Sequence, residues 1–174
     1  EFRRVLFRSD ERGSVLYDKI CQTDAYYTYR SDLAVIKDNA KEIAELVGKD
    51  VTFVDFGCGM CHKSIHLLEA LHDPFSFVLL DIESEVLQKV KEKLKMKHPD
   101  LNVVTQVADF RNKITLPDDG HKKLGLCTGS TISVHPDDGK ETRRRLNEIG
   151  IVFRDGVDCE ERSEEHTSEL QSHL

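Results

Sequence analysis

The chain has 174 residues, of which 39% are hydrophobic and 33% charged, and its formal net charge is −7. This length and apolar content suit one domain with a buried core and are too small for two. The acidic balance argues against nucleic acids and membrane surfaces as partners. No stretch of the sequence reaches the roughly 20 apolar residues of a membrane-spanning helix.

The two ends of the chain have related coding strings. Residues 1–9 can be encoded by GAGTTCAGACGTGTGCTCTTCCGATCT, and the reverse complement of this string translates to residues 162–170. Chance does not produce such a pair, and the string resembles a common sequencing-library adapter. We therefore interpret 1–9 and 162–174 as translated adapter and 10–161 as a partial domain. The alternative is a basic amphipathic leader and an acidic tail.

Hydrophobic spacing predicts an alternation of helices and strands. In chain order we expect helices at 13–23 and 33–47, a strand at 51–56, a helix at 63–71, a strand at 75–81, a helix from 84 to just before 99, strands at 101–107 and 123–127, a helix at 136–149 and a remnant strand at 151–153. Residues 26–30 are expected to form a loop, with Ser31 capping the helix that follows. The alternation predicts an α/β fold, a three-layer sandwich whose parallel sheet has the order 3-2-1-4.

The first predicted strand runs directly into Gly57-x-Gly59. Residues 51–56 are apolar enough for a buried parallel strand, and a helical pattern begins just after the loop. The two glycines let backbone approach a ligand closely, and the following helix offers free N–H groups at its start. Strand, glycine loop and helix in this order indicate a Rossmann-like nucleotide-cofactor site.

Polar residues follow the other strands at the same edge of the sheet, where ligands of such folds bind. Asp81 follows the second strand, where it can accept hydrogen bonds from ribose hydroxyls. Asp109 and Phe110 follow the third, where a methyltransferase places a carboxylate for the adenine amino group. NAD explains the glycines and Asp81 but not this third pair. His62 also stands where a dinucleotide fingerprint usually has its third glycine.

The cysteines are odd in number and scattered, which suits a reducing compartment, so we expect a cytoplasmic protein. They are Cys21, Cys58, Cys61, Cys127 and Cys159. The segment from Cys58 to His62 also has the C-x-x-C-H spacing of haem attachment, and its C-x-x-C leaves zinc or redox use open. Its place on a loop after a buried strand argues against haem.

Six segments together resemble one family, the S-adenosylmethionine-dependent histidine N-alpha-methyltransferases of ergothioneine biosynthesis. They are Gly13-Ser-Val-Leu-Tyr-Asp-Lys-Ile20, Tyr26-Tyr27-x-x-Arg30, Asp55-Phe-Gly-Cys-Gly-x-x-x-Lys63-Ser64, Leu80-Asp-Ile82, Ala108-Asp-Phe110 and Gly129-Ser-Thr-Ile132. Many methyltransferases share the glycine loop, but few combine the tyrosine segment with the last motif. The resemblance covers residues 10 to about 136.

The resemblance implies a class I methyltransferase that transfers methyl groups to the alpha-amino nitrogen of histidine. It implies that S-adenosyl-L-methionine is held by Gly57, Gly59, Lys63, Asp81, Asp109 and Phe110. Tyr26 would line the amino-acid pocket and act catalytically by orienting the amine. Asp55 would orient the loop and favour a cationic ligand. The alternatives are that Tyr26 only packs, that Lys63 is an exposed first-turn lysine and that Asp55 only caps its loop.

Departures from the family fall on the substrate side. Val134 replaces a pocket asparagine, Thr28 replaces a proline, and Ser9 stands where the family has a tyrosine. We expect a substrate domain beyond residue 161. The chain as written is therefore expected to be inactive on histidine, although a small amino acid or amine remains the expected substrate and a monomer the expected state. A nicotinamide oxidoreductase and a non-catalytic nucleotide-binding module stay open as alternatives.

Overall fold

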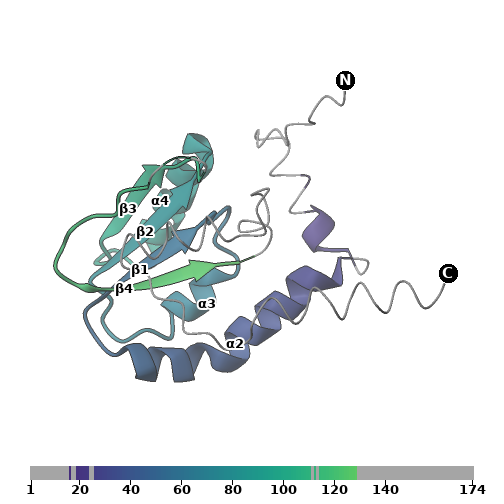
Figure 1. The fold of residues 1–174 in the computed structure, drawn as a ribbon. Helices are drawn as coiled ribbons and strands as arrows, with labels where there is room; N and C mark the ends of the chain where they lie inside the picture. The colour runs from purple at the N-terminus through teal and green to yellow at the C-terminus, as the bar shows by residue number, and fades with distance from the viewer. Residues whose placement is uncertain (1–15, 17–18, 24–25, 111, 113, 129–174) are drawn as a thin grey trace.

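A computed structural model describes residues 16, 19–23, 26–110, 112 and 114–128. Its helices and strands are α2 (Tyr27–Val47), β1 (Val51–Phe56), α3 (Ser64–Leu68), β2 (Ser76–Asp81), α4 (Ser84–Lys97), β3 (Val103–Val107) and β4 (Lys122–Cys127). The four strands form one parallel sheet in the order β3-β2-β1-β4 (Figure 1). The predicted strand order is confirmed.

The central strands β1 and β2 form the centre of the core. Every residue of β1 is buried, as are the first five of β2, because other segments pack on both faces of these central strands. Phe53 pairs with Phe77 in the β1–β2 register, and their rings stack with centroids 4.8 Å apart. The apolar runs at 51–56 and 75–81 predicted this burial, except that Phe75 is 43% exposed and lies before β2.

Three helices pack on the same face of the sheet. Side chains of α2, α3 and α4 share one hydrophobic cluster with Phe53, Phe77 and Leu79. The crossovers β1–α3–β2 and β2–α4–β3 advance in one direction along the sheet, and right-handed crossovers in one direction place their helices on one face. Figure 1 shows α2 and α3 lying side by side beneath the sheet.

The opposite face of the sheet carries a second hydrophobic cluster. Val54, Phe56, Val78 and Leu80 point to this side because neighbouring residues of a strand face opposite ways. Among the described residues this cluster is completed by the segment 108–116 that follows β3. The helix predicted at 136–149, which would contribute to a layer on this side, lies outside the described residues, as does the strand at 151–153.

Helix α2 begins earlier than the sequence predicted. The expected loop at 26–30 is wrong, because Tyr27 through Arg30 form the first turn of α2. Ser31 lies inside the helix, and Tyr26 takes the N-cap position without a side-chain capping bond. The end of the helix was predicted correctly, since Gly48 ends it at φ 82° and donates its N–H to Ala44.

The remaining boundaries differ from the prediction by small amounts that have local causes. Helix α3 ends at Leu68 rather than 71, where the N–H groups of Ala70 and Leu71 bond three residues back and tighten the last turn. Helix α4 begins at the predicted Ser84 and ends at Lys97, before the proline. Of the helix predicted at 13–23, residues 16 and 19–23 are described. Residues 16 and 19–21 are helical, whereas 22 and 23 form a turn and a bend, so the predicted end at 23 is wrong.

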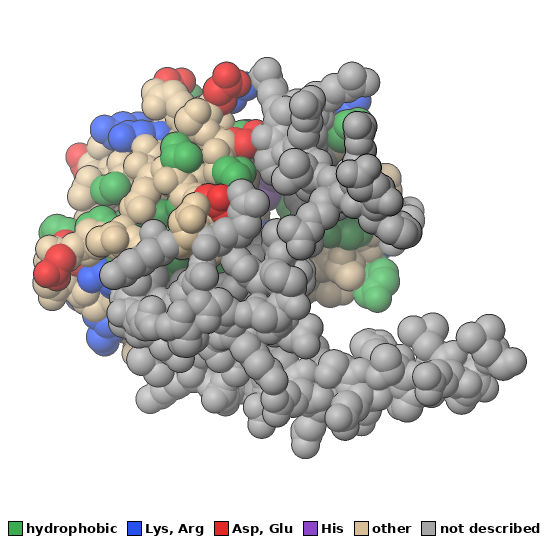
Figure 2. All heavy atoms as spheres, turned by 45° about the horizontal axis from the view of Figure 1, so that its top comes forward, with side chains coloured by type: hydrophobic (Ala, Val, Ile, Leu, Met, Phe, Trp, Pro, Cys, Tyr) green, Lys and Arg blue, Asp and Glu red, His purple; other side chains and the backbone are tan. Residues whose placement is uncertain are grey.

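The described surface mixes both signs of charge. Figure 2 shows Asp and Glu side chains interspersed with Lys and Arg over the visible face. Every helix among the described residues is too short or too polar to cross a lipid bilayer.

Candidate functional site

The glycine loop after β1 turns sharply above the end of β2. Gly57 has φ 71° and Gly59 has φ 47°, a left-handed backbone that favours glycine. The N–H groups of Gly57 and Cys58 both donate to the Leu80 carbonyl, at 2.8 and 3.1 Å. A Cβ placed on Gly59 would meet nothing within 4 Å, so the loop has open space above it. The predicted glycines therefore form a loop that a ligand can approach closely.

Asp81 ties this loop to the second strand. Its Oδ2 accepts the Gly59 N–H at 2.9 Å, and its Oδ1 accepts the Glu83 N–H at 3.1 Å. A carboxylate oxygen has two lone pairs, so each oxygen keeps capacity for a ligand hydroxyl. Asp81 is thus fixed in position at the carboxyl end of β2 while it remains able to accept further bonds.

Asp55 lies buried beneath the loop, at 3% exposure. Burial raises its pKa from 3.8 to about 6, and the charge of Asp81 acts in the same direction. The nearby Ser64 hydroxyl and the Cys61 thiol lower it in part; the thiol donates to Oδ2 at 3.8 Å, whereas the hydroxyl falls short of hydrogen-bond geometry. Near neutral pH Asp55 therefore adds negative charge under the loop, which favours a cationic ligand.

The cysteines near the loop are unsuited to covalent chemistry. Cys58 and Cys61 are 8% and 4% exposed. Hydrogen bonding to Cys61 and burial raise the pKa of Cys58, and burial raises that of Cys127 to about 12, so both stay protonated at neutral pH. The described residues contain no group of three or more His, Cys, Asp or Glu side chains able to hold a metal.

Lys63 points from the start of α3 toward α2. Its Nζ lies 3.0 Å from Asp32 Oδ2 and 5.7 Å from the centroid of the Tyr29 ring. The Lys63 side chain is 13% exposed, so the alternative of an exposed first-turn lysine is wrong. Lys63 also lowers the pKa of Asp55, which places its charge within range of the loop.

The residues after β3 reach the same edge of the sheet. The Ala108 N–H donates to the Asp81 carbonyl at 2.9 Å, so Asp109 directly follows a residue bonded to the end of β2. The Phe110 ring lies 6.2 Å from the Phe56 ring and packs on the second hydrophobic cluster. Asp109 and Phe110 are both half-buried.

Of the residues expected on the substrate side, the structure describes Tyr26 and Thr128 but not Val134. Tyr26 is half-buried at the N-cap position of α2, six residues before Asp32. Thr128 follows β4 directly. Val134 lies outside the described residues.

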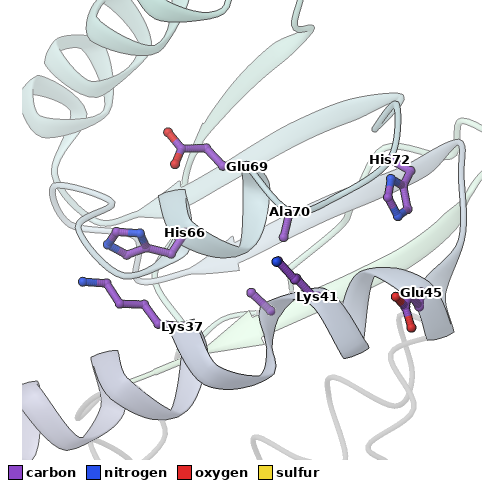
Figure 3. Close-up of a pocket in the computed structure, with 8 residues that line it drawn as sticks. Lys37, Lys41, Glu45, His66, Glu69, Ala70 and His72 are labelled. Carbon is purple, nitrogen blue, oxygen red and sulfur yellow. The ribbon is translucent and has the colours of Figure 1, made fainter.

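A separate groove of about 470 Å³ opens between α2 and α3. Figure 3 shows Lys37 of α2 near His66 at one end of the groove and Glu45 near His72 at the other end. The backbone of His72 forms an isolated parallel β-bridge with Lys49, which lies just before β1 begins. The groove therefore reaches the amino ends of the strands. Ligands of parallel sheets bind at the opposite ends, so we assign the functional site to the glycine loop.

Sequence reasoning missed Asp32 and Tyr29. Asp32 is 31 residues from Lys63, and its partner depends on how α2 crosses α3. One signal was available: residues 29 and 32 are three apart and share a helix face once the helix is extended to Tyr27.

Comparisons with known proteins agree with this geometry. A family model described as histidine-specific methyltransferase, SAM-dependent, matches residues 4–156. The histidine N-alpha-methyltransferase of Mycobacterium tuberculosis (strain CDC 1551 / Oshkosh) is 29% identical over 126 residues, covering 71% of this chain and 39% of that protein. Ergothioneine biosynthesis protein 1 of Schizosaccharomyces pombe (strain 972 / ATCC 24843) is 34% identical over 92 residues, covering 49% of this chain and 12% of that protein.

The fold also has solved counterparts. The crystal structure of an S-adenosylmethionine-dependent methyltransferase from Clostridium acetobutylicum ATCC 824 matches with a TM-score of 0.51 at 18% identity, covering 79% of this chain and 51% of that one. This likeness supports the fold. The chain spans less than half the length of the two sequence relatives described above.

Proposed function

Because the chain belongs to the histidine-specific, S-adenosylmethionine-dependent methyltransferases, we propose that it binds this cofactor for methyl transfer to the alpha-amino group of histidine or a related amine. S-adenosylmethionine is the cofactor of the family. The observation that carries the proposal is the bond from the Gly59 N–H to Asp81, which joins the glycine loop to the acid on the next strand. Family membership favours this function over a nicotinamide oxidoreductase or a non-catalytic module.

The residues at the loop fit the cofactor. Open space above Gly59 admits a ligand, and the fixed Asp81 carboxylate can accept ribose hydroxyls. Asp109 and Phe110 would hold the adenine ring by accepting from its amino group and by packing on its face. Gly57 and Lys63 would complete the set, with the lysine ammonium available to the carboxylate of the methionine moiety.

The chain's contribution to the reaction is positioning and electrostatics. When bound, S-adenosylmethionine supplies an electrophilic methyl group on a positively charged sulfur. The Asp55 and Asp81 carboxylates give the loop a negative field that favours this charge. Tyr26 would orient the acceptor by accepting a hydrogen bond from its neutral amine, leaving the nitrogen lone pair aimed at the methyl carbon.

Binding of S-adenosylhomocysteine, measured by calorimetry, tests the cofactor assignment. We expect the chain to bind this product and not NAD. Asp81→Ala should weaken binding by about 1–3 kcal/mol because it removes two acceptors and frees the glycine loop. Asp109→Ala should weaken it similarly, and Gly57→Val should abolish it by forcing a branched side chain onto a left-handed backbone.

Asp100→Ala is the matched control, an exposed aspartate in the turn after α4 whose loss should leave binding unchanged. Tight binding by Asp81→Ala, or a preference for NAD in the parent chain, would show that the cofactor assignment is wrong.

The substrate side is tested separately. Val134 cannot make the hydrogen bond of the asparagine that it replaces, so we expect the chain as written not to methylate histidine. An assay with a labelled methyl donor measures this activity. Grafting residues 10–136 between a relative's own N- and C-terminal parts should restore turnover if histidine is the substrate, and Val134→Asn should then raise it. Turnover by the unmodified chain would contradict this expectation.

We also propose a cytoplasmic monomer that acts on a small amino acid or amine, without nucleic acid or membrane partners. The net charge of −7 supports the exclusion of polyanions. Among the described residues, Cys58, Cys61 and Cys127 form no disulfide, which supports a reducing compartment.

A further inference from the structure

We propose that Asp32 is a positioning residue that holds the Lys63 ammonium beside the glycine loop and so couples the start of α2 to the cofactor. The inference rests on the proposed function for its consequence, but its first step concerns only the protein. That step is the ion pair between Lys63 Nζ and Asp32 Oδ2 at 3.0 Å.

The surroundings of this pair are more confined than those of an ordinary surface pair. The Lys63 side chain is 13% exposed and the Asp32 side chain 41%. The Tyr29 ring lies 5.7 Å from the same ammonium, so two groups from one face of α2 hold it. For comparison, the Lys49–Asp73 pair joins side chains that are 70% and 81% exposed, as is usual for surface pairs of little consequence.

Asp32 also decides which way the lysine points. Lys63 is the N-cap residue of α3, shortly after the glycine loop, and its positive charge lowers the pKa of Asp55. Without Asp32, the ammonium would be drawn toward Asp55, whose pKa the charge of Lys63 already lowers. The Asp32 carboxylate therefore keeps the lysine out of the loop while leaving two of its three N–H donors for a ligand.

The same contact links two parts of the site. Tyr26, proposed to orient the amine, begins the helix that carries Asp32, whereas Lys63 belongs to the cofactor loop. An ordered lysine also loses less side-chain entropy when it binds a ligand carboxylate. An ion pair that only joined two helices would contribute to the stability of the fold but not to cofactor affinity.

The first experiment measures the rate at which Lys63 is acetylated, by mass spectrometry of the full chain. Asp32→Asn should raise this rate about three-fold relative to the other lysines, because the ammonium loses its anchor. Asp32→Glu should keep it near the parent rate, and so should Asp38→Asn, an exposed acid on the same helix. An unchanged rate in Asp32→Asn would overturn the proposal, whether or not the chain binds any cofactor.

The second experiment measures S-adenosylhomocysteine affinity in a double-mutant cycle. Asp32→Asn should weaken binding about five-fold with the melting temperature nearly unchanged, and Asp32→Glu should restore most of it. In a Lys63→Met background, Asp32→Asn should have no further effect. Equal weakening in both backgrounds, or none in either, would refute positioning through Lys63. A parent chain that fails to bind at all would instead refute the cofactor assignment, and the acetylation result would then stand alone.

Discussion

The protonation state of the Asp55 carboxyl changes near pH 6. Its carboxyl is buried beneath the glycine loop, and burial raises its pKa to about 6. A carboxyl whose pKa is raised on folding binds a proton more tightly in the folded chain than in the unfolded one. Its contribution to stability is therefore complete below its ordinary pKa of 3.8 and is lost as pH rises through 6.

Asp55→Asn should reveal this dependence. The amide keeps the shape of the side chain but carries no charge, so the variant should gain stability relative to the parent by about 2.4 kcal/mol between pH 4 and pH 8. Urea unfolding at both pH values measures the difference. The same comparison for Asp38→Asn, on the exposed face of α2, should be flat. If the Asp55→Asn difference were the same at both pH values, Asp55 would titrate normally.

The positions of the strand ends explain which residues could be predicted to lie together. Asp81 ends β2, and the other predicted residues follow β1 or β3: Gly57, Gly59, Asp109 and Phe110. Because the carboxyl ends of these strands meet at one edge of the sheet, the positions of these residues in the sequence predict that they lie together. The role of Lys63 in binding Asp32 could not be predicted, because it depends on the path of a helix and not on a strand end.

At the scale of elements, the end of α2 depends on one glycine. Gly48 combines φ 82° with ψ −154°, a backbone that side chains other than hydrogen rarely allow. A Cβ there would meet nothing within 4 Å, so any penalty comes from the backbone and not from crowding.

Gly48→Ala should therefore destabilise the fold by about 1–3 kcal/mol without loss of helix content. Thermal unfolding followed by circular dichroism measures this effect. Lys49→Ala, one residue on in an exposed ion pair, should change stability by less than about 0.5 kcal/mol. A Gly48→Ala variant as stable as the parent would mean that the chain leaves α2 by another route.

At the amino ends of the strands, a hydrogen-bond network connects β1 with β2 and with the turn before β4. Thr52 is buried on β1, and its hydroxyl lies 2.5 Å from Asp119 Oδ2 and 3.1 Å from the Ser76 hydroxyl. Partial burial raises the pKa of Asp119, but the Thr52 bond, the His121 N–H and the Lys123 charge outweigh it, so the pKa is lowered. The carboxylate that links β1 to the turn before β4 is thus stabilised in its charged form.

Thr52→Val should cost about 1.5–3 kcal/mol near neutral pH, because it removes a hydroxyl donor to a carboxylate. Since the pKa of Asp119 lies below its ordinary value, the penalty should shrink only as pH falls below 3.8. Denaturant unfolding measures both. Thr105→Val, on the half-buried surface of β3, should have little effect. Equal losses at the two positions would show that the Asp119 link carries no special weight.

Across the whole molecule, the sheet was the most predictable feature. Short right-handed crossovers allow few orders for the three successive parallel strands β1, β2 and β3. The predicted order 3-2-1-4 also reverses direction after β3, and β4 pairs with the free side of β1 as this order requires. The start of α2 was not predictable. Its first turn has no side-chain cap, and the segment before it is held when Arg30 donates to the Thr23 carbonyl at 2.8 Å. Contacts of this kind, between a helix and the segment before it, override local propensity.

The last prediction concerns the two ends of the chain. If residues 1–9 and 162–174 are translated adapter, they were never selected to pack against this domain, and deleting both should leave the melting temperature and S-adenosylhomocysteine affinity unchanged. Deleting residues 1–23 should instead lower stability, because it removes the Thr23 carbonyl that accepts from Arg30. Calorimetry of the three chains measures both effects. A loss of stability on removing the ends alone would show that they belong to the protein.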